Sequence, residues 1–383
     1  MIVVPHLYNT KSLYRTLARF GHAKHIINMQ YEQVLSKKWE DLGAHTPKGE
    51  ACKGVHICWG ENVADRLEKA SVPNENIKII APLHLDLLRP EFLESGMKQK
   101  LAESFNLNAN KRWALFKSSF TYADIDPNRL KMNENAAGIS LADFPVIHTQ
   151  SRNEILNWLK SALEKDKQTI LIYRPHPDEL SLDSVYKLQE EFDNFIVIRD
   201  RGVKDWINAS DVLYTWYSTS IVEAHFMDKP YSILRPYELP DSFDSVLLKN
   251  GRFIQSQKDF ESDYLSAHVS KDKAIDGYYM NLYYKVDLSK PSKDILSDYI
   301  ANIESVNVPI RFSLLSKKYF LAKLKSISII PIYFYTKVFK SNVFSRKSLL
   351  GLLITEIKNQ VTDDVEKKNV RDFTDKVLRS SEK

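Results

Sequence analysis

Two apolar runs in the middle of the chain each lead into polar residues that are suited to binding an anion. The run at residues 170–173 continues as Arg174-Pro175-His176-Pro177, and the run at 212–215 is followed by Ser218-Thr219-Ser220. In an open parallel sheet both clusters would lie at the carboxyl ends of strands, where such folds bind their ligands. A guanidinium, an imidazole and several hydroxyls at one sheet edge therefore predict a phosphate-bearing ligand.

The first cluster is fixed by its two prolines. Pro175 and Pro177 favour extended backbone where the chain leaves the strand, so Arg174 and His176 would be presented in a fixed direction. A histidine there can donate to a phosphate oxygen or respond to protonation near neutral pH. The alternative is a proline-rich turn with an exposed histidine.

The second cluster stands where a helix should begin. Ser218, Thr219 and Ser220 are of residue types that cap helices, and the free backbone N–H groups of a first turn bind anions. Glu223 would lie on this first turn and could accept hydrogen bonds from a ribose or another sugar. Helix capping without ligand binding is the alternative.

Two further strand ends carry cations. Lys117 closes the run at 113–117 and is followed by Ser118 and Ser119, a combination suited to a phosphate or a leaving group. Arg235 follows the run at 231–234 and would reach the same sheet edge. Either cation could instead be solvated or lie away from the ligand.

A metal ion or a cofactor is not expected. Asp124-Ile125-Asp126, beside Pro127, is more typical of a turn than of a metal site. No spacing of His, Cys and carboxylates indicates zinc, and no Gly-rich phosphate loop is present in the sequence.

The elements that must position these residues follow from alternating patterns in the first two-thirds of the chain. We expect strands at residues 2–4, 25–29, 55–58, 77–80, 113–117, 169–173, 195–198, 212–215 and 231–234. We expect helices at 62–69, 152–165, 183–191 and 220–225, a helix and linker over 90–110, and a long loop, acting as a lid or disordered, over 120–145. Such alternation predicts an α/β protein with two doubly wound Rossmann-like domains that face a ligand-binding cleft.

The domain boundaries are set by these patterns and by charge. We expect an acceptor-side domain over 1–105, a ligand-binding domain over 106–310 and a basic amphipathic helical tail over 311–383. The first domain has only about four predicted strands, which leaves open whether an earlier portion is missing.

Composition narrows the class of protein. The chain has 383 residues, 43% hydrophobic and 27% charged, as in a soluble globular protein of two domains. Its two cysteines, Cys52 and Cys58, offer no disulfide framework and fit a reducing compartment. We find no signal-peptide pattern and no apolar stretch of membrane-spanning length.

The positive charge is concentrated in one segment. Residues 311–350 contain nine Lys and Arg and no acid, whereas the whole chain has a net charge of +5. The rest is mildly acidic, which disfavours nucleic-acid binding. Within this segment, residues 321–339 mix apolar and aromatic residues with flanking lysines and predict contact with an anionic inner-membrane surface. A helix with solvated lysines is the alternative.

These motifs resemble those of bacterial surface-polysaccharide glycosyltransferases of GT-B architecture. In several sialyl- and Kdo-transferase families a His-Pro motif and a Ser/Thr pair bind the cytidine nucleotide of the donor, and His176-Pro177 with Ser218-Thr219 or Thr219-Ser220 match them. Arg174-Pro175-His176-Pro177 is also similar to a motif of CDP-glycerol-dependent teichoic-acid polymerases. Residues 28–33 and 56–60 resemble surface carbohydrate biosynthesis proteins, and the likeness covers roughly residues 1–250.

The resemblance implies a glycosyltransferase for capsule or O-antigen synthesis that moves a sugar from a nucleotide-activated donor to a lipid-linked or growing glycan. Arg174, His176, Ser218, Thr219 and Lys117 would neutralise the phosphate charge that develops as the glycosidic bond breaks. The enzyme would be cytoplasmic and peripheral at the inner face of the plasma membrane.

An inverting reaction would also need a base from the first domain. The acidic motif that supplies it in several sialyltransferases is not evident here, so Glu32 is the first candidate and His6 the second. Two alternatives remain open: a CDP-glycerol- or CDP-ribitol-dependent polyol-phosphate transferase, and a non-catalytic binding protein with a GT-B shell.

Overall fold

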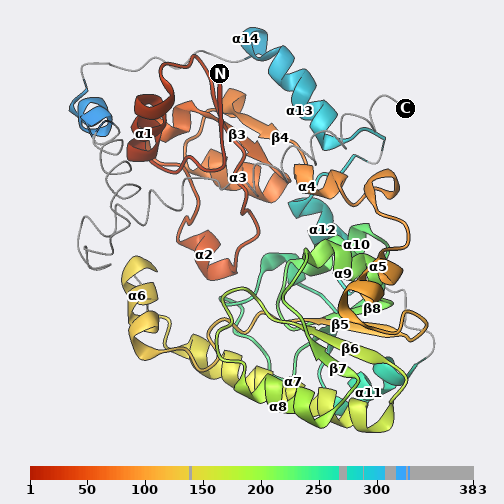
Figure 1. The fold of residues 1–383 in the computed structure, drawn as a ribbon. Helices are drawn as coiled ribbons and strands as arrows, with labels where there is room; N and C mark the ends of the chain where they lie inside the picture. Colours follow the sequence, from red (N-terminus) through yellow and green to blue (C-terminus); the bar gives the residue numbers. More distant parts are fainter. Residues whose placement is uncertain (138–139, 267–273, 288, 307–315, 325–326, 328–383) are drawn as a thin grey trace, which may run out of the picture. The chain divides into compact units, whose positions relative to one another are not determined.

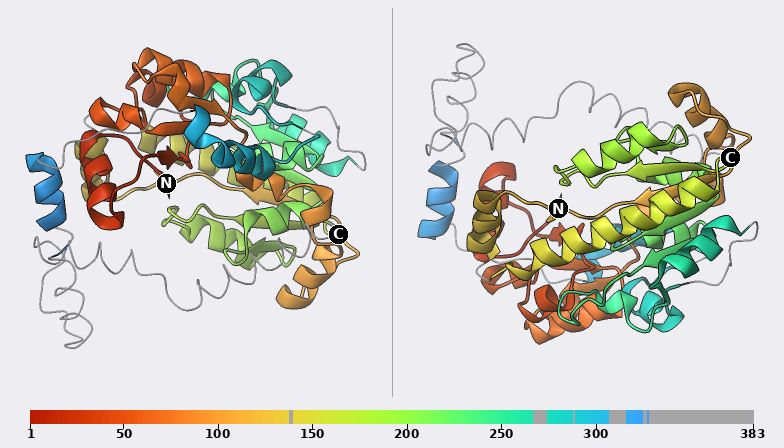
Figure 2. Two further views of the ribbon diagram at one scale, coloured as in Figure 1. Left: turned by 90° about the horizontal axis from the view of Figure 1, so that it is seen from above. Right: turned by 90° about the horizontal axis from the view of Figure 1, so that it is seen from below.

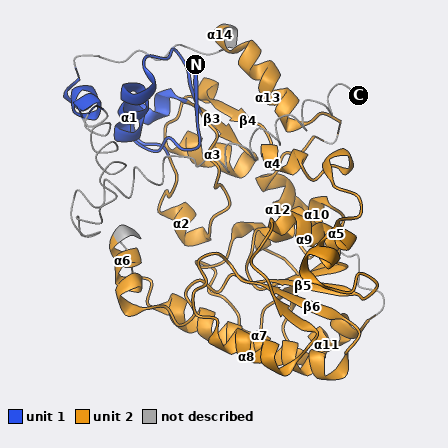
Figure 3. Ribbon diagram, in the orientation of Figure 1, with its two compact units in different colours: residues 1–27, 47–54, 308–383 blue, residues 28–46, 55–307 orange. Residues whose placement is uncertain are grey.

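A computed structural model describes residues 1–137, 140–266, 274–287, 289–306, 316–324 and 327 (Figure 1). The protein is an α/β fold with parallel sheets, as the sequence predicts. It divides into two compact units (Figure 3): unit 1 contains residues 1–27, 47–54 and the described part of 308–383, and unit 2 contains 28–46 and 55–307.

A six-stranded parallel sheet is the centre of unit 2. Its strands lie in the order β10-β9-β8-β5-β6-β7. This is the strand order of dinucleotide-binding folds, in which the direction of winding reverses beside the first strand. The bounds are β5 Trp113–Lys117, β6 Ile170–Arg174, β7 Phe195–Val197, β8 Val212–Thr215, β9 Tyr231–Leu234 and β10 Phe253–Ile254. The prediction included all of these strands except β10.

The sheet is buried on both faces because successive residues of its strands are apolar, and successive side chains of a strand point to opposite faces. In β5, Trp113 and Leu115 join one hydrophobic cluster while Ala114 and Phe116 join another. Residues of α5, α9 and α10 belong to the first cluster, and residues of α7, α8 and α11 belong to the second. Figure 2 shows α7 running along one face. The expected doubly wound arrangement is therefore confirmed for this sheet.

The helices that cover this sheet have the following bounds: α5 Met97–Phe105, α7 Asp143–Lys165, α8 Asp183–Glu191, α9 Val203–Ala209, α10 Ser220–Phe226 and α11 Gln257–Leu265. Of these, α9 and α11 were not predicted from the sequence.

The segment 120–145 is not the long loop that the sequence suggested. It contains α6 (Pro127–Ala137) and the start of α7, which begins earlier than predicted. The backbone N–H groups of Asn128 and Arg129 donate to Asp126 Oδ1 at 2.9 and 3.1 Å, and Pro127 takes the first helical position, where proline is favoured. Asp124 pairs with Arg152. The Asp-x-Asp pattern thus serves turn and cap chemistry, as the sequence favoured.

The rest of unit 2 is built around the parallel pair β3 (Val55–Cys58) and β4 (Ile77–Ile79). The Asp86 carboxylate accepts from the backbone N–H groups of Ser292 and Lys293 at 2.9 and 2.8 Å and so caps α13. The helices here are α2 Lys37–Asp41, α3 Glu61–Lys69, α4 Leu83–Asp86, α12 Gly277–Tyr283, α13 Ser292–Ala301 and α14 Ile303–Val306, with short 3₁₀ turns at Asn74–Asn76, Pro90–Phe92 and Val246–Leu248.

Unit 1 contains β1 (Ile2–Val4), α1 (Thr10–Phe20), a 3₁₀ turn at Gly49–Lys53 and a helical segment at 317–324, and β2 (Ile26–Asn28) ends at its boundary. Asn9 and Ser12 form a capping box at the start of α1. The core of this unit includes Leu7, Leu13 and Leu17, all fully buried.

The predicted basic tail lies largely outside the described residues, since only 316–324 and 327 of the stretch 311–350 are described. None of the helices in the described part of the chain combines the length and the hydropathy that a membrane span requires.

Candidate functional site

The candidate site lies in unit 2, at the point where the winding of the six-stranded sheet reverses. Lys117, the last residue of β5, pairs in register with Arg174 of β6 and with Thr215 of β8. The loops after β5 and β8 leave in opposite directions at such a point and open a crevice at the carboxyl ends of the strands. The predicted clusters follow these three strands, so the fold brings the predicted strand ends together.

Lys117 is a buried cation at this edge of the sheet. Its side chain is 7% exposed, and its Nζ donates to the Ser118 carbonyl at 2.7 Å. Burial lowers the pKa of Lys117 to about 8, partly opposed by the negative charges of Glu179 and Glu223. A buried ammonium that has lost much of its hydration gains more from a bound phosphate than a solvated lysine does.

His176 follows β6 and is held by contacts with its own loop. The Asp178 N–H donates to His176 Nδ1 at 3.1 Å, which places the proton of the neutral ring on Nε2. Burial, and secondarily the charge of Lys117, lowers the pKa of His176. The neutral ring therefore offers an Nε2–H donor at neutral pH.

Glu179 organises this loop, and the sequence prediction did not assign it to the site. It is 1% exposed and accepts from the Ser118 hydroxyl, from the Tyr173 hydroxyl at 2.9 Å and from the His176 N–H at 3.3 Å. Burial raises its pKa, although these three hydrogen bonds oppose the rise. The available signal was a glutamate three residues after the histidine of a strand-end Pro-His-Pro motif.

Two predicted arginines are already engaged by the protein. Arg174 donates to the Asp200 carbonyl at 2.7 Å and to the Arg201 carbonyl. Arg235 is 3% exposed, pairs with Asp244 at 2.9 Å and lies over the rings of Trp216, Tyr217 and Phe253. These contacts hold the loops that follow β7 and β9, and a direct role in ligand binding stays a prediction for both arginines.

The hydroxyl cluster lies at the start of α10, after β8, as expected. Ser218 Oγ accepts from the Ser220 N–H at 3.2 Å and also contacts the Ser220 hydroxyl at 3.2 Å. Thr219 is exposed and makes no side-chain cap, while the Ser119 hydroxyl, in the loop after β5, is buried without a hydrogen-bond partner. The hydroxyl of Ser218 is thus part of the turn, and Thr219 is open to solvent.

Glu223 is a half-buried residue on the first turn of α10, and one oxygen of its carboxylate is buried. Its Oε2 has no hydrogen-bond partner, and burial raises its pKa to about 7, opposed by Lys117 and Lys204. A buried acceptor without a donor carries a free-energy cost that a ligand hydroxyl can relieve. That Glu223 accepts from a sugar stays a prediction.

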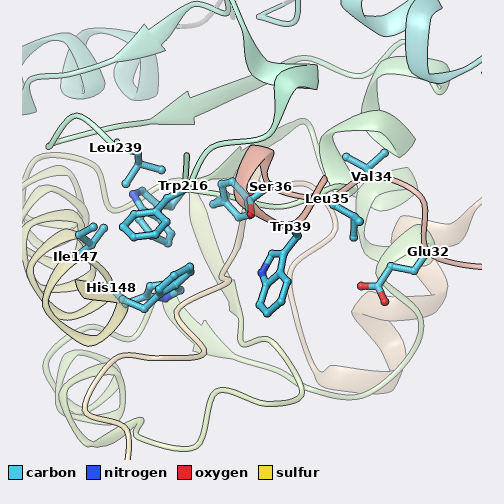
Figure 4. A pocket seen from close by; sticks show the side chains of 12 residues that line it. Glu32, Val34, Leu35, Ser36, Trp39, Ile147, His148, Trp216 and Leu239 are labelled. Atoms are coloured by element: carbon cyan, nitrogen blue, oxygen red, sulfur yellow. The ribbon is translucent and has the colours of Figure 1, made fainter. Parts of the chain in front are cut away.

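A pocket of about 220 Å³ lies in unit 2, between the segment 32–39, the first turns of α7 and the loops that follow β8 and β9. Its walls are largely aromatic, and Figure 4 shows Trp39 between Glu32 at one end and Ile147 and His148 at the other. The indole N–H of Trp216 and the hydroxyl of Ser36 are buried there without partners. An aromatic wall with unsatisfied polar atoms is suited to a ring that carries hydroxyls.

The two predicted bases belong to different units. Glu32 is exposed and lines the aromatic pocket of unit 2. His6 is exposed in unit 1, where its ring stacks on Tyr8 with centroids 5.7 Å apart. His148, which the sequence did not single out, is buried against Trp216, and burial lowers its pKa to about 3. Among the described residues, no cluster of three or more His, Cys, Asp or Glu could hold a metal ion.

Comparisons with known proteins give similar folds at low identity. No protein-family model matches the chain, and no curated protein matches it. A structure of the wall teichoic acid polymerase TagF is 14% identical over 73% of this chain and 68% of its own, with a TM-score of 0.44. In another TagF structure, a H444N variant soaked with CDPG, this chain spans 57% of the length, which is less than two thirds.

Two further similar structures are a UDP-GlcNAc 2-epimerase from Neisseria meningitidis bound to UDP-GlcNAc and MnaA from S. aureus with UDP. The first is 12% identical over 76% of this chain and 74% of its own, and the second 11% over 81% and 79%; both have a TM-score of 0.48. These similarities assign neither a family nor an activity to the chain.

Proposed function

We propose that the chain is a GT-B glycosyltransferase that moves a sugar from a nucleotide-activated donor to a lipid-linked or growing glycan in bacterial surface polysaccharide synthesis. The observation that carries the proposal is the position of the candidate phosphate-binding groups at the reversal point of the sheet. Lys117, His176 and the hydroxyls of Ser218 and Thr219 follow three adjacent strands there. Cytidine is the favoured nucleotide because of the His-Pro motif.

The donor phosphates would be bound by charge and by donors that the fold has already oriented. Lys117 supplies a buried cation and His176 an Nε2–H donor. As the bond between sugar and phosphate breaks, negative charge develops on the phosphate oxygens, and groups fixed beforehand stabilise it without reorganising. Ser118 and Glu179 position this pair through the loop contacts described above.

The acceptor would bind at the aromatic pocket. A sugar ring can pack its apolar face on Trp39 or Trp216, while its hydroxyls meet the buried polar atoms of Trp216 and Ser36. Glu32, which lines this pocket, would remove the proton of the acceptor hydroxyl. The acceptor is proposed to be carried on the inner face of the plasma membrane, where the enzyme would be peripheral.

Product analysis with His176→Ala tests the proposal. The purified chain is supplied with CMP-, CDP- and UDP-activated donors and a glycan acceptor, and the released nucleotide and the extended product are both measured. We expect turnover with one donor class and a loss of about a hundredfold or more in kcat for His176→Ala, since one stabilising donor is removed. His22→Ala, an exposed histidine of unit 1, is the control and should keep its activity.

The outcomes separate the three readings. Glycerol phosphate or ribitol phosphate in the product, with release of CMP, would replace the proposal with a polyol-phosphate transferase. Nucleotide binding without turnover of any donor would indicate a binding protein. If His176→Ala keeps its melting temperature, its nucleotide affinity and its turnover, the assignment of this site is wrong.

A further inference from the structure

Unit 1 carries a strong excess of positive charge over its described residues. Lys and Arg occupy four positions between 11 and 24, positions 48 and 53, and three positions between 317 and 323, whereas Glu50 is the single acid within these described ranges. The exposed members include Lys11, Arg15 and Arg19 on α1 and Lys317 and Lys318 on the helical segment 317–324. The described part of this unit therefore has a positively charged surface.

The two helices that carry this charge pack against each other. The Tyr319 ring lies 6.4 Å from that of Tyr14 and stacks on His22 at 6.0 Å. Lys323 Nζ donates to the Ala18 carbonyl at 3.1 Å. Tyr319 and Ala322 pack on the buried side, against the core of unit 1. Residues far apart in the sequence thus form one two-helix layer.

Large apolar side chains of this layer face solvent. Phe20, at the end of α1, is 64% exposed, and Phe320 and Leu321 are 61% and 54% exposed. Leu324 and Ile327 are also exposed. Single exposed apolar residues are ordinary, but four on one pair of helices, among lysines and arginines, are the pattern of a helix layer that lies in a membrane interface.

We infer that unit 1 binds the surface of an anionic lipid bilayer through both helices, with Phe20, Phe320, Leu321 and Leu324 entering the headgroup boundary. Anionic headgroups complement the basic residues, and the acyl boundary takes up the apolar side chains. A second copy of the chain would present the same positive charge and be repelled, and a nucleic acid would leave the apolar residues exposed. The sequence alone placed membrane contact only in 311–350, whereas α1 adds a second contact element.

Vesicle binding of the full chain tests this inference without any substrate, so its result does not depend on the proposed enzymatic activity. Binding to phosphatidylcholine vesicles with added phosphatidylglycerol is compared with binding to phosphatidylcholine alone by co-sedimentation. We expect binding only to the anionic vesicles, and weaker binding as salt is raised. Arg15→Glu with Arg19→Glu should reduce the affinity by about tenfold or more, since each basic residue near the surface contributes roughly a factor of five.

The matched control reverses two exposed lysines of unit 2, Lys187→Glu with Lys258→Glu, and should bind anionic vesicles almost as the unchanged chain does. A second variant, Phe20→Ser, keeps the charge and should weaken binding if the apolar side chain enters the interface. Circular dichroism and melting temperatures show whether each variant is folded.

Three results would overturn the inference. Equal binding to both kinds of vesicle would remove the electrostatic argument. An equal loss in the unit 2 control would show that net charge alone is responsible. Absence of vesicle binding together with a dimer that Phe20→Ser dissociates, measured by light scattering, would assign the layer to self-association.

Discussion

Glu223 and Lys117 are groups of opposite charge in the candidate site, and burial moves the pKa of each toward neutral pH. Burial raises the pKa of Glu223 from 4.5 to about 7 and lowers that of Lys117 from 10.5 to about 8. Each weakens the shift of the other, because opposite charges favour the ionised forms. Burying the charged forms of these two groups costs free energy, and hydrogen bonds or charges of a bound ligand can offset that cost.

Glu223→Gln should stabilise the protein at high pH. Between pH 4.5 and about 7 the folded chain retains a proton on Glu223 that the unfolded chain has released, so the free energy of unfolding falls as pH rises. Glutamine has no charge to desolvate and escapes this loss. We expect the variant to exceed the unchanged chain by about 3 kcal/mol near pH 8 and to match it near pH 4.

Urea unfolding at a series of pH values measures this difference. Glu190→Gln, an exposed residue of α8, is the control and should show no comparable pH-dependent gain. A Glu223→Gln variant that is less stable than the unchanged chain at high pH would mean that the carboxylate makes stabilising contacts which outweigh its burial.

The residues that could be found from the sequence are those at the ends of apolar runs. Lys117, His176 and Ser218 close or follow such runs, and the structure places them where strand ends meet. Glu179 could not be assigned in this way because its role depends on its burial and on its contacts with Ser118 and Tyr173, both of which precede it in the sequence. No local pattern around Glu179 reveals these contacts. The ion pair between Arg235 and Asp244 could not be predicted either, because it depends on the fold of the loop that follows β9.

At the scale of elements, the strands were easier to predict than the order in which they pair. Runs of strand length gave β5, β6, β8 and β9 within a residue, but β10 has two residues and no comparable pattern. The strand order depends on which helix crosses which face, and no local pattern encodes it. The helix α6 was missed because polar residues dominate it and its start depends on the Asp126 cap.

Gly60→Ala should destabilise the loop between β3 and α3. A Cβ at this position would lie 2.4 Å from the Leu282 carbonyl oxygen and 2.5 Å from the Tyr283 carbonyl carbon, both backbone atoms of α12. Because backbone cannot move aside as a flexible side chain can, we expect a loss of about 2 kcal/mol in the free energy of unfolding.

Gly202→Ala is the matched control, since Gly202 also precedes a helix and a Cβ there would meet nothing within 4 Å. This substitution should be neutral or slightly stabilising. Denaturant unfolding of the two variants under the same conditions compares them. Equal stability of the two would show that the 59–61 loop does not pack closely against α12.

At the scale of the whole molecule, charge and ligand-binding groups are divided between the two units. The ligand-binding candidates at Lys117, His176, Ser218 and Glu223 all belong to unit 2, whereas the described part of unit 1 is basic and carries exposed apolar residues. The sequence indicated a basic tail, but it did not indicate that α1 and the segment 317–324 form one basic surface. That surface follows only from the packing of Tyr319 on Tyr14.

This division predicts that nucleotide binding stabilises the folded chain independently of the unit 1 surface. A ligand that binds only the folded state adds about 2.7 kcal/mol at a concentration one hundred times its Kd, which raises the melting temperature measurably. In a thermal-shift screen of CMP, CDP, UDP, GDP and TDP we expect the largest rise with a cytidine nucleotide. Arg15→Glu with Arg19→Glu should leave this rise unchanged, whereas His176→Ala should reduce it.

Inorganic pyrophosphate separates a nucleotide site from a general anion site. A rise in melting temperature as large as that with CDP would show that the site does not recognise the base. No rise with any ligand would contradict the site itself.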